Sequence, residues 1–184
     1  MSLTASSMLP LGTRAPDFTL TDTISGKSLS LSELKSPLAT VIMFICNHCP
    51  FVIHVQKQLV QVANTYIPKG VRFIAISSND IVNYPDDAPE KMQQVAKELH
   101  YPFPYLYDQD QNVAKAYDAA CTPDFYLFNG QLILVYRGRF DSSRPGSAIP
   151  VTGEDLTQAL NALLETKPIS MQQFPSMGCN IKWK

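Results

Sequence analysis

Along much of the chain, apolar residues form either continuous runs, as in buried β-strands, or repeats every three to four residues, as in amphipathic helices. Residues 39–45, ATVIMFI, are apolar or β-branched at every position, which predicts a central β-strand buried on both faces. Between Val52 and Tyr66, apolar residues recur at three- and four-residue spacing, which predicts an amphipathic helix. Residues 71–77, VRFIAIS, predict a second buried strand. The order strand, helix, strand indicates a right-handed parallel crossover and an α/β core.

The segments outside this core predict further elements. Residues 15–22 and 26–34 alternate apolar and polar positions, which predicts a short N-terminal hairpin leading into a helical turn near Ser32–Leu34. The tail from Pro168 to Lys184 has no periodicity, and we expect an irregular segment lying across the surface. The other expected elements are helices from Asp87 or Ala88 to Leu99, from Gln111 to Tyr117 and from Thr152 or Gly153 to Glu165, and a β-hairpin over 125–138 that turns at Asn129-Gly130.

Composition narrows the possible classes of protein. A chain of 184 residues that is 45% hydrophobic can bury one sizeable core, so we expect a single domain over 1–184. A net charge of -1 gives no basic surplus for nucleic acid, and no apolar run is long enough to cross a membrane. The first residues lack the basic and apolar parts of a secretory signal, so we expect a cytoplasmic protein. Cysteines at short spacing in a reducing compartment are typical of catalysis or metal binding.

Two cysteines follow the first predicted strand in the stretch FICNHCPFV, residues 44–52. A helix N-terminus lowers a cysteine's pKa, because unpaired backbone N–H groups and the helix dipole favour the thiolate. We therefore expect Cys46 to be the nucleophile at the start of the helix. Cys49 lies close enough to attack a mixed disulfide formed on Cys46, so that the Cys-Asn-His-Cys pair can cycle between dithiol and disulfide.

His48 lies between the two cysteines. An imidazolium, or an imidazole that donates a hydrogen bond, would stabilise the Cys46 thiolate and make the couple more oxidising. The alternative is that His48 only occupies an exposed turn.

Several motifs resemble one family over nearly the whole chain. APDFTLTD (15–22), FICNHCPF (44–51) and AACTPDFYLF (119–128) are similar to the opening, the active-site segment and the cis-proline loop of thioredoxin-fold, peroxiredoxin-like proteins of the redoxin and alkyl hydroperoxide reductase group. YRGRFDSSRPG and the terminal PSMGCNIKWK resemble the peroxiredoxin-like thioredoxin branch. The resemblance implies a thioredoxin-like fold, with a central mixed sheet flanked by helices, an N-terminal hairpin extension and an irregular C-terminal tail.

The resemblance also implies a substrate-binding loop. It makes Pro123 the cis-proline that faces the two cysteines, and it gives the backbone of Thr122 the role of pairing with an extended partner chain. Cys121 is then a candidate third redox residue, or else a small residue where two backbones crowd. Arg139 is a candidate for stabilising a thiolate or binding an anionic group, or else a solvated surface residue. We assign no catalytic part to Cys179 in the tail.

The sequence departs from the related families at several positions. The peroxiredoxin pattern Pro-x-x-x-Thr/Ser-x-x-Cys fits neither cysteine, since counting back from Cys46 gives Met43 and Ala39, and counting back from Cys49 gives Cys46 and Ile42. Thioredoxin's buried carboxylate is replaced by Thr40, and the tryptophan before the pair by Ile45. Neither thioredoxin kinetics nor peroxidase activity therefore carries over from the resemblance.

Three functions remain open. The leading one is a thiol–disulfide oxidoreductase that needs no cofactor, acts on protein or small-molecule disulfides and thiols, and depends on a thiol reductant that the sequence does not name. The second is a thiol peroxidase, in which a cysteine is oxidised to a sulfenic acid and condenses with a neighbouring thiol. The third is a copper or zinc module built from Cys46, Cys49 and Cys121 with His48 or His54.

Overall fold

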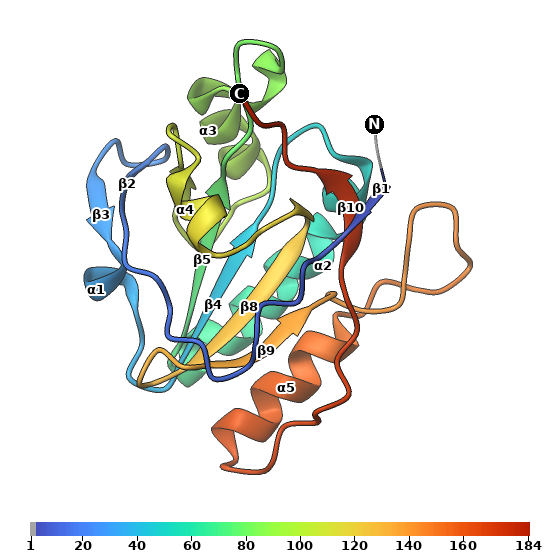
Figure 1. Ribbon diagram of the computed structural model, residues 1–184. Helices are drawn as coiled ribbons and strands as arrows, with labels where there is room; N and C mark the ends of the chain where they lie inside the picture. The colour runs from blue at the N-terminus through green and yellow to red at the C-terminus, as the bar shows by residue number, and fades with distance from the viewer. Residues whose placement is uncertain (1–2) are drawn as a thin grey trace.

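A computed structural model describes residues 3–184 (Figure 1). The strands are β1 (Leu3–Ala5), β2 (Thr19–Asp22), β3 (Ser28–Ser30), β4 (Ala39–Phe44), β5 (Val71–Ser77), β6 (Tyr105–Tyr107), β7 (Cys121–Thr122), β8 (Asp124–Asn129), β9 (Leu134–Gly138) and β10 (Met177–Asn180). The helices are α1 (Leu31–Leu34), α2 (Pro50–Tyr66), α3 (Pro89–Glu98), α4 (Asn112–Ala116) and α5 (Glu154–Leu164), with short 3-10 turns at Ile67–Lys69 and Pro85–Asp87.

The main sheet is mixed, as expected. Its strand order is β3-β2-β6-β5-β4-β8-β9, in which β4, β5 and β6 run parallel and the remaining neighbours pair antiparallel. The predicted parallel arrangement of residues 39–45 and 71–77 is confirmed by the β4–β5 register, which pairs Ala39 with Val71 and Phe44 with Ile76. The expected α/β class and thioredoxin-like fold are confirmed.

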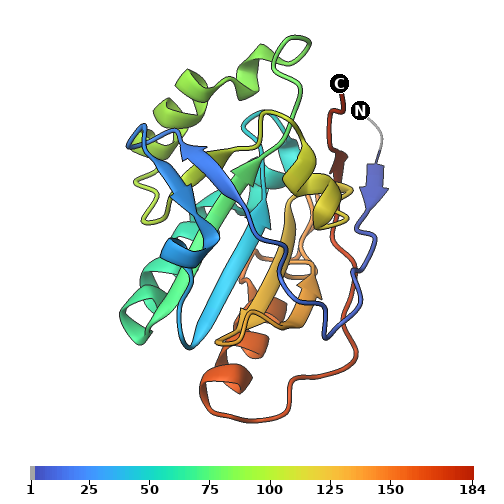
Figure 2. The ribbon, with the colours of Figure 1, turned by 60° about the vertical axis from the view of Figure 1, so that its left-hand side comes forward.

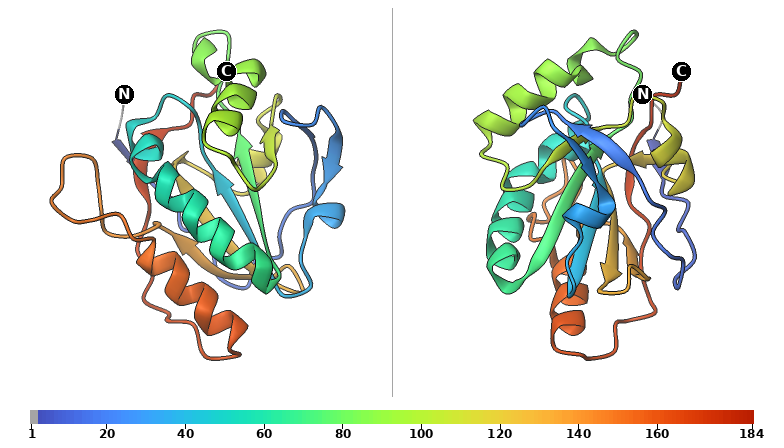
Figure 3. Two further views of the ribbon diagram at one scale, coloured as in Figure 1. Left: turned by 180° about the vertical axis from the view of Figure 1, so that it is seen from behind. Right: turned by 90° about the vertical axis from the view of Figure 1, so that its left-hand side faces the viewer.

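The central strand β4 is buried on both faces because helices or loops cover each side of the sheet. Val41 and Met43 point into a core shared with α2, α3 and α5. Ile42 and Phe44 point into a second core, beneath α1 and α4. Figure 3 shows α2 crossing the first of these faces. This two-sided burial explains why the strand is apolar at nearly every position.

The N-terminal hairpin forms as predicted and joins the main sheet. Strands β2 and β3 pair antiparallel, and β2 also pairs with β6. Ser30 caps α1 in a reciprocal capping box with Glu33, which explains why the helical turn begins directly after β3. Strand β6 has no clear signal in the sequence, because this three-residue strand follows a segment with prolines at 102 and 104, which are unfavourable in strands.

The prediction of an irregular C-terminal tail is wrong for residues 177–180. These residues form β10, which lies between β1 and β7 in a second sheet of order β1-β10-β7. Figure 2 shows the red C-terminal strand beside the blue strand β1. A four-residue segment, MGCN, that contains glycine carries no strand signal of its own, and it becomes a strand only through pairing with distant residues. No helix in the described part of the chain is long and apolar enough to span a membrane.

Candidate redox site

The two cysteines lie in the loop that joins β4 to α2. Helix α2 begins at Pro50, and Cys49 is its N-cap residue, whose carbonyl accepts hydrogen bonds from the N–H groups of Val52 and Ile53. Proline is favoured at this first helical position because its missing N–H would have no acceptor there. The expectation that Cys46 begins the helix is therefore corrected: Cys49 lies at the helix N-terminus, and Cys46 lies three residues earlier.

The loop at Thr122-Pro123 faces the cysteine pair, as the resemblance implied. The Thr122–Pro123 peptide bond is cis. The Cys46 Sγ lies 3.4 Å from the Thr122 Oγ1, and the Cys49 Sγ lies 3.2 Å from the Thr122 carbonyl oxygen. All four cysteines of the chain are buried, and none is part of a disulfide. Thr122 therefore touches both sulfurs of the pair.

Hydrogen bonding between the two cysteines shifts their pKa values in opposite directions. A hydrogen bond from the Cys46 thiol is the largest cause that lowers the pKa of Cys49, to about 5, and further donors to its sulfur include the Val52 N–H at the start of α2. The same hydrogen bond, with burial and the nearby Asp87 carboxylate, raises the pKa of Cys46. Because the helix begins at Cys49, the negative charge of the pair resides on Cys49 rather than on Cys46.

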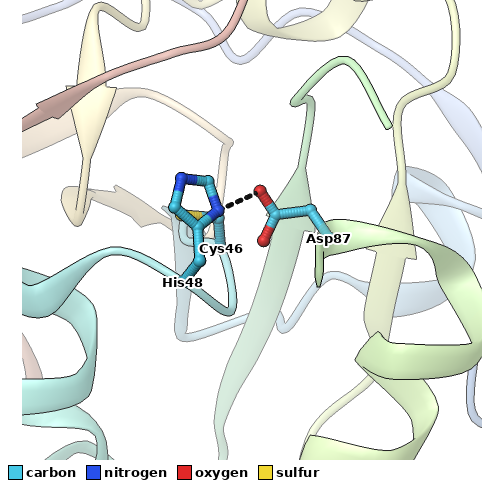
Figure 4. Close-up of side chains that lie close together, drawn as sticks. All are labelled: Cys46, His48 and Asp87. Carbon is cyan, nitrogen blue, oxygen red and sulfur yellow. Dashed lines mark ion pairs between the residues drawn. The ribbon is translucent and has the colours of Figure 1, made fainter. Parts of the chain in front are cut away.

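His48 forms an ion pair with a buried carboxylate that the sequence analysis did not identify. Its Nδ1 lies 2.7 Å from the Asp87 Oδ2, and Figure 4 shows the two side chains pointing toward each other beside Cys46. The hydrogen bond to Asp87 raises the pKa of His48. Burial alone would raise the pKa of Asp87, but the hydrogen bonds from His48 and Asn79 lower it overall.

Asp87 is held in place from several elements. The Asn47 N–H donates to its Oδ1 at 2.7 Å, and the Asn79 side chain donates to its Oδ2 at 2.7 Å. The Tyr84 ring stacks on His48 with centroids 5.5 Å apart and an angle of 10° between the rings. His48 is thus a fixed member of the site rather than a residue of an exposed turn. The sequence carried no signal for Asp87 beyond its position just before a helix.

The other predicted site residues lie farther from the sulfurs. The Cys121 thiol contacts the backbone carbonyls of Pro123 and Ser176 at 3.9 and 4.0 Å. Burial is the largest cause that raises the pKa of Cys121, so its neutral thiol is favoured. Arg139 lines a hollow together with Pro123, but its guanidinium Nε lies 2.6 Å from the Asp155 Oδ2.

The predicted metal ligands are only partly brought together. In the described part of the chain, the group whose ligand atoms all lie within 4.8 Å of one another consists of Cys46, His48 and Asp87. His54 is instead hydrogen-bonded to Ser143, with 2.7 Å between its Nε2 and the Ser143 Oγ. A metal at this group would have to displace hydrogen bonds and an ion pair that already occupy both oxygens of Asp87. The geometry therefore favours thiol chemistry over metal binding.

A dithiol between a buried strand and a helix, facing a cis-proline strand, defines a thiol redox protein of thioredoxin fold. The model of the AhpC/TSA family matches residues 11–137, and the chain belongs to this family. Family membership and fold together support oxidoreductase activity based on thiols. Comparison with curated proteins found no match.

Solved structures extend these findings. An uncharacterized conserved protein from Geobacillus kaustophilus is 61% identical, with a TM-score of 0.99, over 100% of this chain and 97% of that one. A hypothetical protein from Sinorhizobium meliloti 1021 is 45% identical, with a TM-score of 0.96, over 98% of both chains. A secreted disulfide oxidoreductase from Mycobacterium tuberculosis shares the fold at 20% identity and a TM-score of 0.61, over 79% of this chain and 96% of that one.

Proposed function

We propose that the protein is a thiol–disulfide oxidoreductase that uses the Cys46–Cys49 pair. The observation that carries this proposal is that the sulfurs of Cys46 and Cys49 both lie against Thr122, at 3.4 and 3.2 Å, in the loop with the cis-proline. An isolated buried cysteine would keep a neutral thiol, because burial disfavours the thiolate. A pair that stabilises one negative charge is instead ready for thiol–disulfide exchange.

Cys46 is the attacking residue and Cys49 the resolving one. Cys46 retains 2% of its surface exposed whereas Cys49 has 0%, which favours Cys46 for first contact with a partner. As Cys46 attacks the partner's disulfide, its proton passes to Cys49 and the partner's first sulfur leaves as a thiolate. Cys49 then attacks the Cys46 sulfur, gives up its proton to the departing sulfur and closes the Cys46–Cys49 disulfide. The partner gains two electrons and one proton and leaves as one thiolate and one thiol, and the pair loses the same.

His48 and the substrate-binding residues have defined parts in this proposal. The imidazolium of His48, held by Asp87, lies beside Cys46 and offsets the carboxylate charge that disfavours a thiolate there. A partner would approach Cys46 through the hollow that Pro123 and Arg139 line beside the site. Anionic small-molecule thiols are within the proposed substrate class, because Arg139 contributes a positive charge to the lining of this hollow.

Trapping a mixed disulfide tests the proposal. The Cys49→Ser variant, incubated with glutathione disulfide, should accumulate glutathione on Cys46, because the resolving thiol is absent. Cys121→Ser is the matched control and should accumulate none, because its pair is intact. Modification of Cys121 instead of Cys46 in the Cys49→Ser variant would contradict the assignment.

A thiol peroxidase is the second candidate, and membership in the AhpC/TSA family favours it. In this case a thiolate of the pair is oxidised by a hydroperoxide to a sulfenic acid, which the other thiol converts into the disulfide with loss of water. Consumption of hydrogen peroxide by the reduced protein, measured against the Cys46→Ser and Cys49→Ser variants, separates the two functions. Peroxide left unconsumed while disulfides are exchanged would support the oxidoreductase alone.

A further inference from the structure

Strand β10 occupies the edge that the resemblance assigns to an extended partner chain. Cys179 of β10 pairs antiparallel with Thr122 of β7, the residue before the cis-proline, and Asn180 pairs with Cys121. The other edge of β10 is held by β1, where Leu3 pairs with Cys179. The chain thus adds its own C-terminal strand where strand addition would place a substrate.

The residue before Cys179 must be a glycine for this pairing to form. A Cβ on Gly178 would overlap the backbone carbonyl of Thr122. The absence of a side chain allows the two backbones to approach each other at the site, as glycine does at other close backbone contacts. Gly178 therefore lets β10 sit directly against the loop that faces the cysteine pair.

This strand brings a third sulfur to the pair. Cys179 lies opposite Thr122 in the strand pairing, and the Thr122 carbonyl oxygen is 3.2 Å from the Cys49 sulfur. Hydrogen bonding from Cys179 is among the causes that lower the pKa of Cys49. Cys179 is 3% exposed and belongs to the same buried cluster as Cys46 and Cys49. Cys46, Cys49 and Cys179 therefore lie together around Thr122.

We propose that β10 is an internal substrate strand and that Cys179 is a third redox residue, which exchanges with the Cys46–Cys49 disulfide. This inference rests on the proposed function. The Cys179 sulfur attacks the Cys49 sulfur, the Cys46–Cys49 bond breaks, and the Cys49–Cys179 bond forms. The proton of the Cys179 thiol passes to the departing Cys46 sulfur, so one disulfide replaces another and no external oxidant is needed.

The exchange gives the oxidised protein two states. In one, Cys46 is blocked in the Cys46–Cys49 disulfide. In the other, Cys46 is again a free thiol, while Cys49 is held by Cys179 and cannot resolve a mixed disulfide on Cys46. The chain would then hold a bound partner on Cys46 until Cys49 is released.

Disulfide mapping of the full chain tests the inference. The Cys46→Ser variant is oxidised with diamide, alkylated, digested with trypsin and analysed by mass spectrometry. Cys49 and Cys179 lie in different tryptic peptides because Lys57, among others, separates them, so their disulfide appears as a cross-linked pair. We expect the Cys49–Cys179 cross-link to be the main product, and Cys46→Ser combined with Cys121→Ser to give the same product. A Cys49–Cys121 cross-link, or no cross-link, would overturn the inference.

A second measurement keeps both cysteines of the pair and compares the wild-type chain with Cys179→Ser. At half oxidation in a glutathione buffer, acid quenching should trap both Cys46–Cys49 and Cys49–Cys179 disulfides, and Cys179→Ser should retain only the first. If Cys46–Cys49 forms reversibly and Cys49–Cys179 never appears, the inference fails while the proposed function stands. If neither disulfide forms, both fail.

Discussion

The backbone of Gly178 in β10 passes so close to the carbonyl of Thr122 in β7 that a methyl group on Gly178 would overlap the carbonyl oxygen. The same carbonyl oxygen lies 3.2 Å from the Cys49 sulfur. The position of the C-terminal strand and the geometry of the redox pair therefore depend on one point of backbone contact.

The substitution Gly178→Ala should detach β10 from the site. We expect alkylation of Cys179 in the native protein to become at least about tenfold faster, because a displaced strand exposes its side chain. Iodoacetamide labelling followed by mass spectrometry measures this rate. Gly146→Ala is the control, since a Cβ there meets nothing within 4 Å, and its φ of +80° makes it a test of backbone strain without an overlap. Equal protection of Cys179 in the two variants would show that the contact at Thr122 does not hold the strand.

The low pKa of Cys49 predicts that Cys49 is a thiolate at neutral pH. Because the pKa of Cys49 is lowered to about 5, thiolate absorbance at 240 nm in the reduced protein should fall as the pH is lowered through 5. Cys49→Ser should abolish this transition. Cys46→Ser should move it to higher pH, because the Cys46 thiol is the largest cause of the lowered pKa. A transition that persists near pH 5 in Cys49→Ser would place the charge on another sulfur.

The His48–Asp87 ion pair predicts a pH window of stability. The raised pKa of His48 gives stabilisation that is complete below its ordinary value of 6.5 and is lost as the pH rises through the higher native value. The lowered pKa of Asp87 gives stabilisation present above its ordinary value of 3.8 and lost as the pH falls through the lower native value. Asp87→Asn should therefore lower the free energy of unfolding by about 3 kcal/mol within this window and by less above it.

Urea unfolding at several pH values measures this difference. The exposed neighbour Asp86 supplies the control Asp86→Asn, which should change the stability little at any pH. NMR titration of the His48 ring should show its pKa falling in Asp87→Asn. An unchanged ring titration would contradict the ion pair.

The raised pKa of Asp124 predicts that its contribution to stability decreases as the pH rises, in contrast to that of Asp87. Burial is the largest cause that raises its pKa, to about 8, although Tyr126 and the Phe125 N–H donate hydrogen bonds to it. Between pH 4 and 8 the folded state holds a proton that the unfolded state has released, so this group's contribution to stability falls as the pH rises. Asp124→Asn should be more stable than the wild type by a few kcal/mol above pH 8, with the difference vanishing near pH 4. If the free energy of unfolding has the same pH dependence in the wild type and in Asp124→Asn, the raised pKa of Asp124 is refuted.

The parts of the fold that the sequence predicted are long segments whose pattern of apolar residues is typical of one kind of secondary structure. Strand β4 and helix α2 have apolar patterns that fit one structure only, and their junction placed Cys46 and Cys49 correctly beside the Thr122-Pro123 loop. The sequence placed the start of the helix at Cys46, three residues before the observed N-cap Cys49, because the loop residues before Pro50 have no periodicity.

The missed parts arise from contacts between residues far apart in the sequence. Asp87 reaches His48 from a separate loop, and nothing local distinguishes it from its exposed neighbour Asp86. Cys179 lies in a four-residue strand whose glycine and asparagine are unfavourable in strands, so only pairing with Thr122 reveals it.

The most direct test of the account is thiol mapping of the wild-type chain across a series of glutathione redox buffers. The account predicts that a Cys46–Cys49 disulfide forms and is reduced reversibly, with a midpoint that tells whether the protein oxidises or reduces its partners. If Cys46 and Cys49 remain thiols in every buffer while the protein stays folded, the proposed redox function is contradicted.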